Sequence, residues 1–215
     1  MRTIDLQTWS RREHFKVYSG LDHPHFGLCA NVDISQFHSF IKQQDISFNI
    51  AVIYLISRVA NEIPEFRYRI RTGEVIEHEI VHPSSTILVK DDLFSFCTFE
   101  YTEHFPNFLH KAKEQIENIK GHPFLKDPPG TDNLLFMTAI PWVSFTSFMH
   151  PMHSSPPDSV PRFAWGKYFE ENGVRKMPLA VQGHHALMDG IHIGRFYERA
   201  QDFLHRPELL LGSTN

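Results

Sequence analysis

Hydrophobic and polar positions alternate along the chain with two periodicities, one typical of helices and one typical of strands. Helical spacing of apolar residues marks the stretches 47–63, which Pro64 ends, and 103–120, and two shorter helices are predicted near 10–18 and 35–41. Strand-like alternation occurs at 26–32, 66–71, 75–80, 86–89, 94–101, 134–140, 142–148 and 162–169. This order predicts an α+β protein, a two-layer sandwich in which helices cover a mixed β-sheet.

The stretch 178–204 contains both periodicities, first that of a strand and then that of a helix. An apolar strand over 178–185 ends in His184 and His185, the chain turns at Asp189-Gly190, and a helix follows. Because successive side chains of a strand point to opposite faces, one histidine faces the interior and the other faces a cleft or a neighbour. The helix has one apolar stripe, made of Ile193, Phe196, Ala200, Phe203 and Leu204.

Two other interpretations of the histidines remain open from the residues alone. A metal site made of His184, His185, Asp189 and His192 is disfavoured, because zinc needs ligands that converge and adjacent strand residues diverge. A purely structural histidine pair is the ordinary expectation for an isolated dipeptide of this kind.

Composition narrows the class of protein. With 215 residues, 41% of them hydrophobic and 21% charged, the chain is expected to form one domain over 1–215 with a sizeable core. A net charge of −4 does not favour binding to nucleic acid or to an anionic membrane, and no apolar run approaches the length of a membrane span. The two cysteines, Cys29 and Cys97, fit a reducing compartment, so a cytoplasmic location is expected.

Several motifs, in order and at family spacing, resemble the chloramphenicol acetyltransferases. The family signature of two histidines followed by Asp-Gly and a histidine stands at Gln182–His192. The signature also occurs in condensation domains and dihydrolipoyl acyltransferases, but no lipoyl or carrier segment accompanies it here. The other matches are WSRREHF at 9–15, PEFRYRI at 64–70, VHP at 81–83, PWVSFTSF at 141–148, GKYF at 166–169 and MPLAVQ at 177–182.

The resemblance implies an acetyl-CoA-dependent O-acetyltransferase without a metal. It further implies a homotrimer whose active sites lie between subunits, with a small-molecule acceptor and acetyl-CoA entering from opposite ends. His185 would be the general base, a task that suits a neutral imidazole with a pKa near the working pH. In the family this imidazole is held by its own backbone carbonyl. Ser147 would donate a hydrogen bond to the oxyanion; a nucleophilic role is disfavoured, since no G-x-S-x-G motif surrounds it.

The same resemblance assigns supporting roles. Asp189 would form an ion pair with Arg11 rather than act in a catalytic triad, with a simple turn residue as the alternative. Tyr18 and Phe94 would line the acceptor pocket, with core packing as the alternative for Phe94. Lys167 and Tyr168 would lie near the nucleotide of CoA.

Some positions depart from the family, and they concern substrates rather than the catalytic pair. Chloramphenicol is therefore the leading acceptor, with a different alcohol or thiol as the alternative. A non-catalytic ligand-binding relative is a third hypothesis, which the intact His185 and Ser147 disfavour. The departures are Gly183 and Ile191 in the signature, Ala164 in place of a threonine, Ser47 and Asn49 in place of a lysine and a tyrosine, and the segment 149–161.

Overall fold

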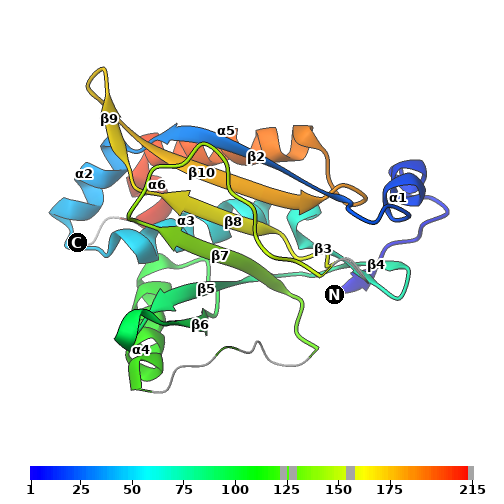
Figure 1. The fold of residues 1–215 in the computed structure, drawn as a ribbon, viewed down its shortest axis with the longest axis horizontal. Helices are drawn as coiled ribbons and strands as arrows, with labels where there is room; N and C mark the ends of the chain where they lie inside the picture. Colours follow the sequence, from blue (N-terminus) through cyan, green and yellow to red (C-terminus); the bar gives the residue numbers. More distant parts are fainter. Residues whose placement is uncertain (122–124, 126–129, 154–157, 213–215) are drawn as a thin grey trace.

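The computed structural model describes residues 1–121, 125, 130–153 and 158–212. A large sheet carries helices on one face, and a small sheet lies near α1 at one end of the molecule (Figure 1). The large sheet has the order β2 (His25–Asp33), β10 (Val174–His184), β8 (Arg162–Gly166), β7 (Leu134–Ile140), β5 (His82–Leu88) and β6 (Phe94–Thr98), and β9 (Phe169–Glu171) pairs with β10. The small sheet consists of β1 (Arg2–Thr3), β4 (Glu74–Glu77) and β3 (Tyr68–Arg71).

The helices are α1 (Arg12–Tyr18), α2 (Ser35–Gln43), α3 (Phe48–Glu62), α4 (Phe105–Gly121), α5 (Gly190–His205) and α6 (Pro207–Leu211), with short 3₁₀ turns at Pro64–Arg67 and Lys90–Asp92. Strand β7 runs parallel to both β5 and β8, while the other pairs of the large sheet are antiparallel. The predicted α+β sandwich with a mixed sheet is confirmed.

The core lies between the sheet and helices α3 and α5. Ten of the fifteen residues of α3 are buried, which explains why its sequence is apolar around most of the helix. The five residues of the predicted α5 stripe are all buried, so this stripe faces the core as expected. Phe66, Phe163 and Phe196 meet there with ring centroids 5.2–5.8 Å apart.

The sequence-based expectation of a strand over 142–148 is wrong. Strand β7 ends at Ile140, and no strand is assigned from Pro141 to Phe148. Pro141 has no backbone N–H and cannot continue the ladder. Trp142 and Val143 are 66% and 54% exposed, so their alternating apolar pattern is not used by the core of this chain.

The other expected helices and strands overlap the observed ones, but β5 begins at His82, four residues before the expected strand at 86–89, and β10 begins at Val174, four residues before the expected strand at 178–185. Asn172-Gly173 joins β9 to β10, and both residues have positive φ, 53° and 76°, as a tight hairpin turn requires.

Strand β10 carries the histidine turn to the end of the sheet near α1 (Figure 1). It pairs with β2 over nine successive residues, from Lys176 opposite Asp33 to His184 opposite His25. Leu179 and Val181 face the helices and are fully buried in the core. Gln182 and His184 therefore face the other side of the sheet, because their side chains alternate with those two.

The departure at Gly183 has a packing explanation. A β-carbon built on Gly183 would overlap the sulfur of Met188 and lie 3.0 Å from its Cγ. Met188 is 1% exposed, and it occupies the space that an aliphatic side chain at 183 would need.

We therefore expect Gly183→Val to destabilise the protein by about 1–3 kcal/mol, the usual cost of overpacking a core. The same substitution in a Met188→Ala background is expected to cost less, because the smaller side chain leaves room. Urea denaturation of the four proteins measures both costs. Equal costs in the two backgrounds would show that Met188 does not fill the space left by Gly183.

Candidate active site

His184 is a buried structural residue. It is 3% exposed, its ring lies edge-on to His25 at 5.2 Å, and its Nδ1 accepts a hydrogen bond from the backbone N–H of Ala186 at 3.3 Å. Burial lowers the pKa of His184 to about 4, with a further contribution from the neighbouring histidines. The imidazole is neutral at pH 7, and it anchors the turn from within the fold.

His185 points to the other side and is the reactive candidate of the pair. Its ring stacks on Tyr18 with centroids 3.9 Å apart and planes 3° from parallel, and Phe26 packs against it at 4.5 Å. Its backbone N–H donates to the carbonyl of Pro24 at 2.8 Å. The side chain remains 29% exposed. Two aromatic rings thus fix the plane of the imidazole while one edge stays accessible.

Arg11 joins the first helix to this turn. Its guanidinium donates to both carboxylate oxygens of Asp189 and, at 3.1 Å, to the backbone carbonyl of His185. The contact that the sequence assigned to Arg11 and Asp189 is therefore present, between residues 178 positions apart. Hydrogen bonding from Arg11 lowers the pKa of Asp189, so its carboxylate is ionised at neutral pH.

The surroundings of the imidazole differ in one respect from the expected arrangement. The carbonyl of His185 accepts from Arg11, and no bond from the ring to that carbonyl is present among the described residues. Nδ1 lies 3.1 Å from Oδ1 of Asp189, but no directed hydrogen bond joins them, so the attraction is electrostatic. The carboxylate favours the tautomer with hydrogen on Nδ1, which leaves Nε2 as the basic nitrogen.

The other predicted site residues lie apart from His185. Ser147 is exposed, and no described contact joins it to the imidazole. Phe94 lies on β6, at the opposite edge of the sheet from β2, and is 47% exposed, so core packing within one chain does not explain it. Lys167 and Tyr168 lie between β8 and β9, and the backbone N–H of Lys167 donates to the carbonyl of Val143.

Sequence reasoning did not single out Phe26. Strand pairing explains its position, because Phe26 stands opposite Gly183 in β10, two residues before His185. No signal within the sequence of β2 alone would have found it, since the contact depends on the register between β2 and β10.

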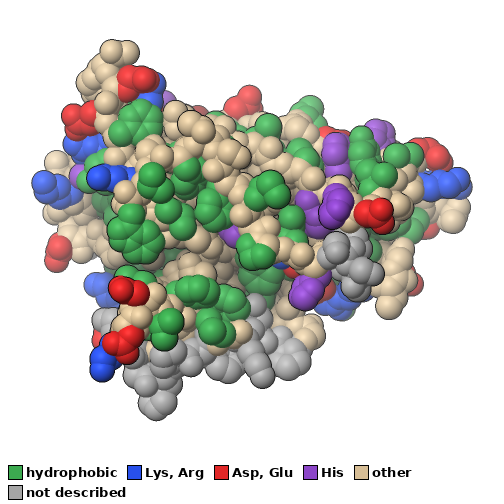
Figure 2. Space-filling model, viewed as in Figure 1, with side chains coloured by type: hydrophobic (Ala, Val, Ile, Leu, Met, Phe, Trp, Pro, Cys, Tyr) green, Lys and Arg blue, Asp and Glu red, His purple; other side chains and the backbone are tan. Residues whose placement is uncertain are grey.

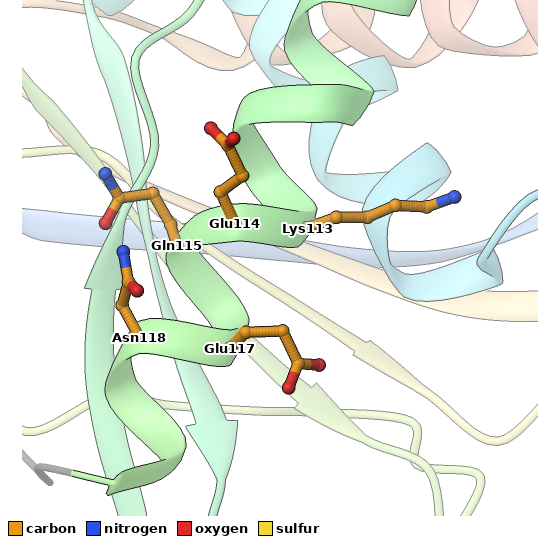
Figure 3. A pocket seen from close by; sticks show the side chains of 5 residues that line it. All are labelled: Lys113, Glu114, Gln115, Glu117 and Asn118. Atoms are coloured by element: carbon orange, nitrogen blue, oxygen red, sulfur yellow. The ribbon is translucent and has the colours of Figure 1, made fainter.

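Two depressions on the described surface lie away from this site. One of about 580 Å³ lies on the outer side of α4 and is lined by five polar side chains of that helix alone (Figure 3). Another, of about 390 Å³, lies at residues 2–10. His185 lines neither of them. Figure 2 shows histidine side chains gathered on the surface near α1 instead.

Among the described residues, no group of three or more histidine, cysteine, aspartate or glutamate side chains is arranged to hold a metal ion. No described helix is both long and apolar enough to cross a membrane.

Comparison with known proteins gives the class and then the family. A solved chloramphenicol acetyltransferase matches with a TM-score of 0.84 and 29% identity, covering 94% of this chain and 99% of the other. A dihydrolipoamide acetyltransferase of Azotobacter vinelandii matches at 0.70 and 16% identity, covering 92% and 88%, which shows the fold alone. The fold is thus one that acyltransferases use.

The sequence is similar to curated chloramphenicol acetyltransferases. One from Clostridium perfringens is 33% identical over 215 residues, covering 97% of each chain. One from Klebsiella sp is 33% identical over 203 residues, covering 94% of this chain and 92% of the relative. The sequence model of the family described as chloramphenicol acetyltransferase matches residues 1–201. This chain belongs to the chloramphenicol acetyltransferase family and is an acyltransferase.

We expect Arg11→Met and Asp189→Asn to have the same effects on stability and on turnover, because each strands the other partner of one ion pair. The pair is partly buried, with the Arg11 side chain 11% and the Asp189 side chain 28% exposed. Each substitution should therefore lower the free energy of unfolding by about 1–3 kcal/mol, between the values for surface and for buried ion pairs. The double variant should be no worse than the worse single one. Urea denaturation and initial rates across the double-mutant cycle measure this.

Additive losses in that cycle would show that the two residues do not interact. A loss of about 10⁴-fold in kcat for Asp189→Asn alone, with Arg11→Met nearly active, would instead assign Asp189 the orienting role of a triad acid.

Proposed function

We propose that the protein transfers the acetyl group of acetyl-CoA to a hydroxyl of chloramphenicol or of a similar small acceptor, and thereby confers antibiotic resistance. The observation that carries the proposal is His185, held between Tyr18 and Phe26 with Nε2 free of described hydrogen bonds. It lies in a chain at least 32% identical to several proteins named for this reaction.

In the proposed mechanism, Nε2 of His185 removes the proton from the acceptor hydroxyl as its oxygen attacks the thioester carbonyl. The tetrahedral intermediate then collapses, the bond from carbon to sulfur breaks, and the CoA thiolate takes the proton from the imidazolium. The two rings keep the imidazole in one plane during both transfers, and the charge of Asp189 stabilises the cation between them.

Ser147 is proposed to donate its hydroxyl hydrogen to the oxyanion of the intermediate, as the family motif PWVSFTSF implies. Tyr18 and Phe94 are proposed to line the acceptor pocket, and Lys167 and Tyr168 to contact CoA. The reaction as written needs no metal.

We propose that the active form is a homotrimer with sites between subunits. Within one chain no described contact joins Ser147 or Phe94 to His185, so one chain alone does not assemble the proposed site. A subunit interface would also cover apolar side chains that are exposed in one chain: Trp142, Val143 and Met149 after β7, and Leu88, Leu93 and Phe94 around β5 and β6. A solution mass by light scattering of about three times 25.1 kDa tests the trimer.

One domain over 1–215 and a cytoplasmic location stay predictions from composition. Cys29 and Cys97 are both free thiols, as a reducing compartment would keep them.

A different acceptor is the second candidate, and the segment 149–161 favours it. This segment departs from the family, and two of its described residues make polar contacts: Asp158 forms an ion pair with Arg162, its carbonyl contacts Nε2 of His25 at 2.5 Å, and His150 contacts Gln182 at 3.3 Å. Polar groups in a changed segment suit an acceptor other than chloramphenicol.

We expect His185→Ala to abolish nearly all acetyl transfer and Ser147→Ala to lower kcat by about 10²-fold, the effect of one lost oxyanion donor. His184→Ala, the matched control on the other side of the turn, should reduce stability more than turnover. The measurement is release of the CoA thiol with acetyl-CoA, with and without chloramphenicol.

The acceptor series in this assay separates the hypotheses. Turnover with chloramphenicol supports the first candidate, and turnover with other alcohols or thiols alone supports the second. Saturable ligand binding without any turnover would identify a non-catalytic relative and end the proposal. Equal catalytic losses in folded His184→Ala and His185→Ala proteins would contradict the assignment of His185 as the base.

A further inference from the structure

His192, the last histidine of the signature at Gln182–His192, has no part in the mechanism proposed above, yet the fold buries it. It is 7% exposed and lies in the first turn of α5, between the exposed Ile191 and the fully buried Ile193. A polar ring is costly to bury unless its nitrogen atoms find partners, so the contacts of His192 call for an explanation.

The ring of His192 joins two turns of the chain. The backbone N–H of Asp189 donates to its Nδ1 at 2.8 Å, and because a backbone N–H can only donate, Nδ1 is the acceptor. A neutral ring therefore carries its hydrogen on Nε2. This nitrogen lies 3.3 Å from Oε1 of Glu65, in the 3₁₀ turn Pro64–Arg67. The contacts of the ring thus specify one tautomer.

The bond from Asp189 to His192 is half of a capping box. His192 is the third residue of α5, and in a capping box the side chain at this position accepts the backbone N–H of the residue that precedes the helix. Glutamate or glutamine usually fills this position. The carboxylate of Asp189 is bonded to Arg11, so Arg11 holds the side chain of Asp189 and His192 holds its backbone.

Asp189 carries this constraint to the proposed base. Its Oδ1 lies 3.1 Å from Nδ1 of His185, and the Arg11 guanidinium that binds its carboxylate also donates to the backbone carbonyl of His185. A displaced backbone at Asp189 would move the carboxylate and disturb Arg11 with it. The orientation of His185 therefore depends on a bond that His192 makes four residues away from Asp189's partner carbonyl's neighbour in the turn, through Asp189 alone.

The role requires a neutral imidazole. A doubly protonated ring donates from both nitrogen atoms and cannot accept the N–H of Asp189. Burial lowers the pKa of His192, and the charges of Arg11 and Arg195 act in the same direction, while Glu65 and Asp189 oppose them. The net shift is downward, so the ring is neutral at pH 7.

We propose that His192 is a positioning residue for acetyl transfer: its neutral ring holds the backbone of Asp189, and so keeps the Asp189 carboxylate and Arg11 in place around His185. The proposal rests on the role proposed above for His185 as the base. His192 itself contacts neither substrate in this scheme and acts through Asp189.

The kinetic test compares His192→Leu with His192→Gln. Leucine fills the space without an acceptor, so kcat should fall by about 10- to 100-fold, the effect of a small misplacement of the reacting groups. The KM for acetyl-CoA should change little, because no group proposed to contact CoA is removed. Glutamine restores the acceptor of an ordinary capping box, so His192→Gln should keep kcat near that of the wild type.

His205→Leu is the matched control. His205 is the last residue of the same helix and its side chain is 53% exposed, so this variant removes a histidine from α5 without touching the turn. Both kinetic constants should equal those of the wild type. Thermal melting of every variant shows whether it is folded.

Two measurements on the whole protein need no turnover. Nitrogen NMR of isotope-labelled histidine, assigned by the signals lost in His192→Gln, should show a neutral ring with hydrogen on Nε2 at pH 7. Because folding lowers the pKa of His192, protonation favours the unfolded chain, and the stability due to the ring is lost as pH falls below about 6.5. The melting temperature of the wild type should then fall more steeply than that of His192→Gln.

The outcomes separate this inference from the proposed function. A charged ring at pH 7, a hydrogen on Nδ1, or parallel melting curves overturn the inference, and turnover by the wild type would still support the function. Unchanged kcat in folded His192→Leu, or equal losses in the leucine and glutamine variants, also overturns it. If His192→Leu does not fold, the NMR signals and the melting curves decide. A wild type without turnover overturns the function and, with it, the positioning role.

Discussion

The alternation of side chains along β10 is the constraint on which the rest of the site depends. The nine-residue pairing with β2 fixes the register of this strand up to His184. The side chain of His184 is therefore buried, and that of His185 points to the opposite side. A shift of the strand register by one residue would exchange the two histidines, burying His185 and exposing His184. The pKa of His184 is low because burial disfavours the charged form of its imidazole.

Strand pairing ends at His184, so the position of His185 depends on contacts from distant parts of the chain. Tyr18 and Arg11 come from the N-terminal helix, and Pro24 and Phe26 come from the start of β2. Tyr18 and Phe26 hold the plane of the ring, Arg11 holds the backbone carbonyl, and Pro24 holds the backbone N–H. His185 is thus oriented mainly by packing and backbone bonds, and the Asp189 carboxylate, hydrogen-bonded to Arg11, contributes charge more than direction.

The pattern of apolar residues predicted those helices and strands that have a clear pattern within their own sequence. Helix α3 and strand β7 were predicted to within two residues of their observed bounds, because each is a mainly apolar stretch that ends before a proline, Pro64 or Pro141. The segment 142–148 was not, since its apolar alternation is exposed in one chain and follows a proline. Within the site, the Arg11–Asp189 contact came from family resemblance, and Phe26 required knowledge of strand register. Neither is encoded in a local window, because each joins segments more than a hundred residues apart.

The departures from the family show how a fold absorbs changes near its site. At Gly183 a lost aliphatic side chain is replaced in volume by Met188, which lies five residues later in the turn after β10 and is buried. The exchange joins two segments in contact, so the volume is kept while the residue that supplies it changes. Ala164 differs, because it is fully buried between Ala180 and Thr138 of the adjoining strands. Compensation for a smaller side chain at such a position has to come from those adjoining strands, because the neighbours of Ala164 in its own strand point to the opposite face of the sheet.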